Sequence, residues 1–154
     1  MGEGESMGPL TPAMKREALA QQADFHFDIP WTTLGQYLDH LARRGVSPNV
    51  ASFVGAATVR ENVLGNSDRA PAPDELKRMC RLVRQAMREG ALGVSSALIY
   101  TPGVYARTEE LIALCQVAAR EKGIYISHLR SEGNRLLESV DELITIAREA
   151  KLPA

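Results

Sequence analysis

Short apolar segments alternate with longer amphipathic segments from residue 49 onward. The apolar segments are residues 49–55, 92–95 and 124–127, and each precedes residues whose apolar positions recur at helical spacing. The clearest helical pattern runs from residue 74 to residue 89 and places on one face Leu76, Met79, Cys80, Val83 and Met87. This alternation predicts right-handed βαβ units and a parallel sheet covered by helices. Three or four such units cannot close an eight-stranded barrel, which takes about 250 residues. The predicted α/β fold is therefore either a small open sheet or part of a barrel.

The segment before these units is predicted to contain loops and helices. Residues 1–10 form a glycine-rich loop, and residues 11–22 predict a helix that opens on Thr-Pro. Residues 24–30 alternate polar and apolar positions, which favours a short extended segment. A capping box at residues 33–36 predicts a second helix, which Gly45 ends.

Length and composition limit the classes of protein to consider. With 154 residues the chain is at most one ordinary domain, comprising a loop and helices in residues 1–45 and βα units in residues 46–154. Apolar residues make up 45% and charged residues 24%, a mixture typical of a soluble globular protein. A formal charge of −1 gives no electrostatic footprint for nucleic acid or an anionic membrane. Without a membrane-length apolar run or a signal-peptide pattern, the expected location is cytoplasmic.

Cys80 and Cys115 are predicted to be small core residues in a reducing compartment.

A cluster of polar residues follows the third apolar segment. His128, Arg130 and Glu132 come directly after residues 124–127, which read as a buried strand. The carboxyl ends of parallel strands are where α/β proteins place their chemistry, so His128 is the first candidate functional residue. A single histidine is also often a satisfied structural residue. His128 and Glu132 have the spacing of two metal ligands on one helix, but Gly133 and the preceding strand place them in a loop.

Several blocks of the sequence resemble one known family. They are GALGVSS at 90–96, LIYTPG at 98–103, TEELI at 108–112 and GIYISHLRSEG at 123–133, and the similarity includes residues 47–55 and Arg60. In this order they are similar to the D-aminoacylase, or N-acyl-D-amino-acid deacylase, family of the amidohydrolase superfamily. The resemblance covers nearly the whole chain. It implies part of a (β/α)8 TIM-type metallohydrolase barrel whose complete enzyme hydrolyses N-acyl-D-amino acids to a D-amino acid and a carboxylate.

The resemblance also implies a metal site. His128 occupies the position of the histidine that binds a divalent metal, usually zinc, in the family's histidine-arginine-glutamate-glycine block, and the complete enzyme would hold one or two ions. Residues 1–10 are similar to a block whose second ligand is commonly a cysteine. Aligning Ser6 and Pro9 with that block places Glu3 at the ligand position. A carboxylate also binds zinc, although an exposed loop carboxylate is an equally open interpretation of Glu3.

Further roles follow from the same resemblance. Tyr100 occupies an aromatic position associated with binding the carboxylate of the substrate. Arg130 and Glu132 would support the site through hydrogen bonds to the ligands, or would form a structural ion pair with each other. The other metal ligands of the family and its catalytic aspartate have no counterpart in residues 1–154, and neither His26 nor His40 matches them. The chain is therefore expected to be inactive by itself.

Two other interpretations remain open. The chain could be a non-catalytic remnant or interaction fragment of an amidohydrolase, with unpaired sheet edges that favour self-association. Alternatively, Gly93-Val94-Ser95 partly resembles the nucleophile turn of serine hydrolases, although the final glycine of that motif is absent.

Overall fold

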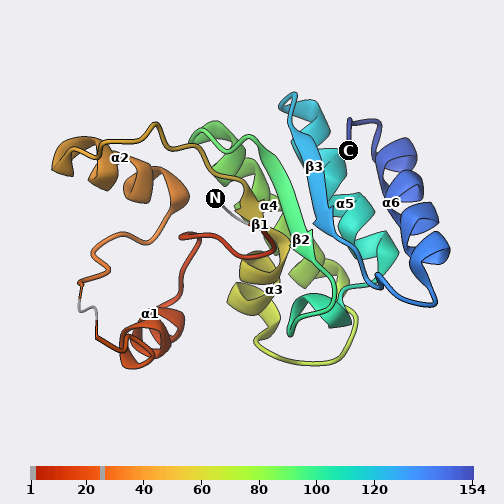
Figure 1. Cartoon of the computed structure of the whole chain (residues 1–154), viewed down its shortest axis with the longest axis horizontal. Coiled ribbons are helices and arrows are strands. Elements are labelled where there is room, and N and C mark those ends of the chain that lie inside the picture. Colours follow the sequence, from red (N-terminus) through yellow and green to blue (C-terminus); the bar gives the residue numbers. More distant parts are fainter. Residues whose placement is uncertain (1–2, 25–26) are drawn as a thin grey trace.

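The computed structural model describes residues 3–24 and 27–154, which contain two N-terminal helices followed by units of strand and helix (Figure 1). The N-terminal helices are α1 (Pro12–Ala20) and α2 (Leu34–Arg44). The later elements are β1 (Val54–Gly55), α3 (Ala56–Leu64), α4 (Pro73–Arg88), β2 (Gly93–Ala97), the 3-10 helix η1 (Gly103–Tyr105), α5 (Thr108–Arg120), β3 (Ile124–His128) and α6 (Leu136–Ala150).

Local capping explains where the N-terminal helices begin and end. The hydroxyl of Thr11 accepts a hydrogen bond from the Met14 amide, and the hydroxyl of Thr33 accepts one from the Gln36 amide. The Gln36 side-chain oxygen accepts a hydrogen bond from the Thr33 amide, which completes the predicted capping box. Gly45 ends α2 with a φ of 75°, a conformation that glycine adopts without strain. The two predicted helices are therefore confirmed.

The three strands form one parallel sheet in the order β1-β2-β3. Strand order follows chain order, so right-handed crossovers carry the connecting helices to the same face of the sheet. Helices α3, α4, α5 and α6 accordingly pack against one another in sequence, and Figure 1 shows α5 and α6 side by side. A doubly wound sheet would instead reverse direction and cover both faces. The predicted parallel α/β fold is confirmed, and its arrangement is that of a barrel wall.

The two faces of the sheet have different surroundings. Val54, Val94 and Tyr125 are paired in register on the helix-covered face, and each is fully buried. On the opposite face, Ile124 and Ile126 are 38% and 37% exposed. The loop that precedes α1 crosses this second face near β1 and β2. Its Gly4 donates to Ser95 Oγ at 3.3 Å and accepts a hydrogen bond from the Ala57 amide at 3.0 Å.

Three segments differ from the sequence prediction. The strand expected at 49–55 is reduced to its last two residues, although the Leu92 amide still bonds the Ser52 carbonyl at 2.9 Å. Strand β2 extends beyond residue 95 because β3 pairs with it as far as Ala97. The structure assigns no strand to 152–154, yet Pro153 O accepts a hydrogen bond from the Tyr125 amide at 2.9 Å. These last residues therefore lie along the outer edge of β3.

Other predictions for the N-terminal part and the cysteines can also be compared. Of residues 24–30, the described ones have no regular structure, and His26 lies outside the described residues. Cys115 is fully buried and Cys80 is half-buried, and both are free thiols. Burial raises the pKa of Cys115 to about 12, so this thiol stays protonated and behaves as a core residue. Within residues 3–24 and 27–154, no helix is long and apolar enough to cross a membrane.

Candidate functional site

His128 is the last residue of β3 and points from the carboxyl end of the sheet. Its backbone is fixed because the His128 carbonyl accepts hydrogen bonds from the Leu98 amide at 3.0 Å and from Ser127 Oγ at 3.1 Å. Its side chain is 21% exposed, so the ring is held in place yet open to solvent. A histidine held on a strand end in this way has the setting of a ligand or a catalytic group.

Two carboxylates flank the His128 ring, one at each nitrogen. Glu3 Oε1 lies 3.0 Å from Nδ1, although 125 positions separate the two residues. Glu132 Oε1 lies 3.4 Å from Nε2. Both carboxylate side chains are 68% exposed. The structure therefore brings Glu3 and Glu132 to the same ring from the first loop and from the loop after β3.

Tyr100 completes the group on the side of β2. It follows the carboxyl end of β2, and its ring meets the ring of His128 edge-on, with centroids 5.7 Å apart. Tyr100 is 58% exposed, so much of this residue is open to solvent. The ends of two neighbouring strands therefore bring the rings of Tyr100 and His128 into contact.

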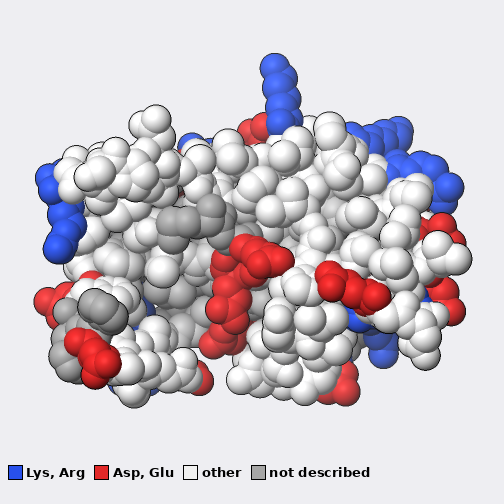
Figure 2. Space-filling model, viewed as in Figure 1, with Lys and Arg blue, Asp and Glu red and all other residues white. Residues whose placement is uncertain are grey.

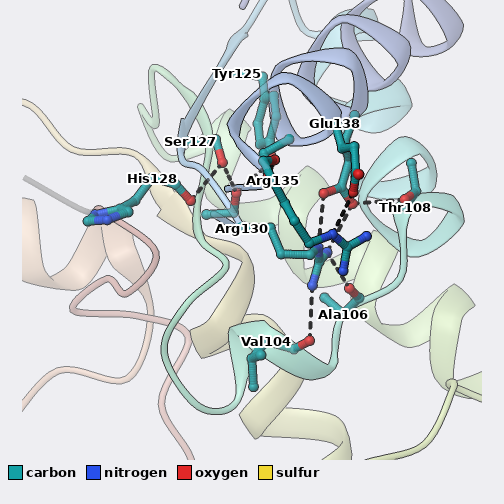
Figure 3. Close-up of polar contacts among 12 residues, drawn as sticks. Val104, Ala106, Thr108, Tyr125, Ser127, His128, Arg130, Arg135 and Glu138 are labelled. Carbon is teal, nitrogen blue, oxygen red and sulfur yellow. Dashed lines mark hydrogen bonds and ion pairs between the residues drawn. The ribbon is translucent and has the colours of Figure 1, made fainter. Parts of the chain in front are cut away.

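Arg130 contacts neither His128 nor Glu132. Its guanidinium makes a two-bond ion pair with Glu142 of α6, with Nε and Nη2 each 2.9 Å from a carboxylate oxygen. The predicted alternative of an ion pair between Arg130 and Glu132 is therefore wrong. The reason is geometric, because the two side chains leave the loop in different directions, Glu132 towards the His128 ring and Arg130 towards α6. Figure 3 shows the His128 ring pointing away from this cluster.

Sequence reasoning did not identify Glu142 or its second partner. Thr108 donates to Glu142 Oε1 at 2.8 Å from the start of α5. Burial raises the pKa of Glu142, but the hydrogen bonds and charge of Arg130 and the bond from Thr108 lower it further, so the net shift is downward. No local pattern could have revealed this cluster, because its members come from three separate elements.

The donors at His128 suit one part of a metal site. Ligands of zinc lie about 2 Å from the ion, so two of them are about 3 Å apart, as His128 Nδ1 and Glu3 Oε1 are. Imidazole nitrogen and carboxylate oxygen are both ordinary zinc ligands. Among residues 3–24 and 27–154, however, no group of three or more histidine, cysteine, aspartate or glutamate side chains could hold an ion. The described residues therefore fit a metal as two ligands of a larger set.

The serine-hydrolase interpretation has no structural support. Ser95 is fully buried in the middle of β2, and its hydroxyl accepts a hydrogen bond from the Gly4 amide. A nucleophilic serine of that class is instead exposed on a sharp turn at the end of a strand. His40 does not belong to the candidate site either. It lies on α2, and its ring packs against that of Trp31 with centroids 5.1 Å apart.

A separate acidic cleft of about 570 Å³ lies between the first loop, α1 and α3. Its wall includes Glu5, Glu17 and Glu61, and Figure 2 shows acidic side chains concentrated along the middle of the visible face. Burial, followed by the charges of Glu17 and Glu5, raises the pKa of Glu61. None of Glu3, Tyr100 or His128 lines this cleft, so the cleft is not part of the candidate site around His128.

Comparison with known proteins gives relatives that share this whole segment. No family model matches the chain. The chain is 32% identical to the D-aminoacylase of Alcaligenes xylosoxydans xylosoxydans over 97% of its own length and 31% of that protein. It is 34% identical to the N-acyl-D-aspartate deacylase of the same organism, over 77% of its length and 24% of that protein.

Solved structures agree with the sequence relatives. A D-aminoacylase with a binuclear metal centre superposes with a TM-score of 0.87 and 29% identity, over 99% of this chain and 32% of that one. The chain belongs to the D-aminoacylase family of amidohydrolases. The N-acyl-D-glutamate deacylase of Bordetella bronchiseptica, in complex with zinc and a phosphonate inhibitor, gives a TM-score of 0.84 at 28% identity, over 98% and 31% of the two chains. The chain thus spans about a third of the length of the D-aminoacylase relatives that it matches.

Proposed function

We propose that residues 1–154 form part of the catalytic domain of a zinc-dependent amidohydrolase that removes the acyl group from N-acyl-D-amino acids. The main support is the contact of His128 Nδ1 with Glu3 Oε1 at 3.0 Å, at the carboxyl end of the sheet. Two side chains of kinds that bind zinc, an imidazole and a carboxylate, meet there in a chain related to D-aminoacylases. The metal centres of these relatives support one or two divalent ions in the complete enzyme.

Each side chain of the site has a defined task in this proposal. His128 and Glu3 would hold zinc, which would polarise the scissile carbonyl and lower the pKa of a bound water to about 7. Glu132, 3.4 Å from His128 Nε2, orients the imidazole ring from its other side. Tyr100 presents an exposed phenol beside the ring, where it can donate a hydrogen bond to the carboxylate of an N-acyl-D-amino acid.

The polypeptide of 154 residues is expected to have no activity by itself. Catalytic zinc normally has three protein ligands and an open position, whereas the described residues provide no group of three. The remaining ligands and the general base would come from parts of the relatives that these residues do not match. A non-catalytic remnant of the same family is the second candidate, and the same incomplete ligand set favours it.

Zinc titration by calorimetry tests the proposal. Wild-type chain should bind zinc, and His128→Ala or Glu3→Gln should each weaken the affinity at least about tenfold, since each removes one of two ligands. Glu5→Gln is the matched control, because it neutralises a carboxylate in the same loop that does not contact His128. Equal affinity in wild type and His128→Ala would refute the metal site.

The two candidate functions need a separate test. Sequencing the gene beyond both ends of this segment should find codons for the other metal ligands of the family and for its catalytic aspartate. Stop and start codons in their place would favour the remnant.

A further inference from the structure

The guanidinium of Arg130 joins three segments around the candidate site. Besides the two bonds to Glu142, Nη1 donates to the Val104 carbonyl at 3.0 Å and Nη2 donates to the Ala106 carbonyl at 2.8 Å (Figure 3). Four of its five N–H groups are therefore used. The contacts connect the loop after β3 to α6 and to the turn that contains η1.

The turn held by Arg130 is also the support of Tyr100. The Val104 amide donates to the Tyr100 carbonyl at 2.8 Å, and the Val104 carbonyl accepts from Arg130, so the backbone of Val104 links Tyr100 to Arg130. On the other side, Arg130 is two residues beyond His128 on the same chain. Tyr100 and His128 come from neighbouring strand ends. Arg130 connects both of these ends to Glu142 on α6.

We propose that Arg130 is a positioning residue that sets the Tyr100 ring against the His128 ring by holding the turn 103–106 to α6. This inference rests on the proposed function, because the two rings are the proposed substrate-binding and metal-binding groups. Arg130 touches neither ring. It acts through the backbone of the turn and through Glu142, which Thr108 holds from α5.

The planar fork of arginine is required for this task. Glu142 uses both carboxylate oxygens, and the two carbonyl groups lie on the other edges of the same guanidinium. A lysine ammonium is a single charged centre with three donors and cannot reach all four acceptors at once. The side chain of Arg130 is 29% exposed and that of Glu142 is 13% exposed, so water does not fully replace these bonds.

Proton NMR of the chain without metal tests the proposal. The wild type should give a cross-peak between the ring protons of Tyr100 and His128, whose centroids are 5.7 Å apart. Arg130→Gln should abolish this cross-peak. Trp31 precedes α2 and Tyr37 lies on it, and their ring centroids are 5.0 Å apart. The cross-peak between these two rings should persist and so report that the fold is intact.

Arg135→Gln is the matched control, because it removes an exposed ion pair to Glu138 from the same loop and should leave both cross-peaks unchanged. If Arg130→Gln does not fold, Arg130→Lys decides, since it keeps a positive charge beside Glu142 but loses the fork. A retained Tyr100–His128 cross-peak in the folded variant overturns the proposal. Failure of the wild type to bind zinc would refute the proposed function alone, because this measurement needs no metal.

Discussion

Arg60 and Glu110 form an ion pair that is closed to solvent, with a distance of 2.5 Å between Nη1 and Oε2 and side chains that are 0% and 2% exposed. The pair fastens α3 to α5, and Arg60 Nη2 also donates to the carbonyls of Ser67 and Arg69 in the loop before α4. Burial raises the pKa of Glu110 more than the charge and hydrogen bond of Arg60 lower it. For Glu110, the energetic cost of removing the charge from water therefore exceeds its favourable interaction with Arg60.

Breaking this pair should be strongly destabilising. Glu110→Gln leaves the Arg60 charge buried without its counter-ion, and we expect the free energy of unfolding to fall by about 3–5 kcal/mol. The double variant Arg60→Met/Glu110→Leu should recover most of the loss, because it removes both charges. Equilibrium unfolding in urea measures both effects, and a double variant no more stable than Glu110→Gln would contradict this account.

Close packing of β2 against β3 depends on Gly93. A Cβ atom placed there would lie 1.8 Å from the carbonyl oxygen of Ile124, which is part of the backbone and cannot turn aside. Gly93→Ala should therefore cost about 3 kcal/mol of unfolding free energy, the upper end for overpacked sites. Gly133→Ala is the control, because its Cβ would meet only Ser131 Oγ at 4.0 Å, and it should change stability by less than about 0.5 kcal/mol. Thermal or urea unfolding compares the two.

A row of three hydroxyl groups, of which those of Ser96 and Tyr125 are buried, predicts unequal effects of two substitutions. Ser127 donates to the His128 carbonyl, so Ser96 must donate to Ser127 and Tyr125 to Ser96, at 2.9 Å and 2.6 Å. Burial, only partly offset by the bonds to the two serines, raises the pKa of Tyr125 to about 12, so the phenol stays a donor at neutral pH.

Ser96→Ala should cost more than Tyr125→Phe. The serine variant leaves the buried Tyr125 hydroxyl without its acceptor, at about 1–3 kcal/mol, whereas Tyr125→Phe removes the first donor of the row and should cost about 1 kcal/mol. Urea unfolding of the two single variants gives the order. The reverse order would show that the protons of the row point the other way.

A surface carboxylate gives the clearest pH dependence. Glu75 accepts two bonds from Arg69 at 2.6 Å each and one from the Ala72 amide at 2.7 Å. The Arg69 hydrogen bonds, followed by that of Ala72, lower the pKa of Glu75 from 4.5 to about 2. Because the pKa is lower in the folded state, this group stabilises the fold above pH 4.5 and loses its contribution as the pH falls through about 2.

Carbon-13 NMR of the Glu75 carboxyl should show a titration midpoint near pH 2 in the wild type. Arg69→Gln should move the midpoint upward towards 4.5, since it removes the main cause of the shift. Titration of wild-type Glu75 near 4.5 would mean that the Arg69 contact is not maintained in solution.

Much of the local structure follows from the sequence itself. Thr33 and Gly45 specify both ends of α2 through a capping box and a positive φ, and these effects act within four residues. The apolar run before His128 likewise predicts a strand with a polar residue at its end. The bounds of β1 were less predictable, because the length of a strand depends on how far its neighbour pairs with it.

The composition of the candidate site was decided by tertiary structure. Glu3 meets His128 across 125 positions, and only a resemblance to other proteins suggested that pairing. Arg130 binds Glu142 on α6 rather than Glu132 in its own loop. Sequence patterns report interactions between residues close along the chain, whereas the partners of a side chain at a strand end depend on the path of every loop that reaches that end. The sequence by itself thus determined the helices, the parallel strands and the position of His128, and the folded chain determined which charges surround it.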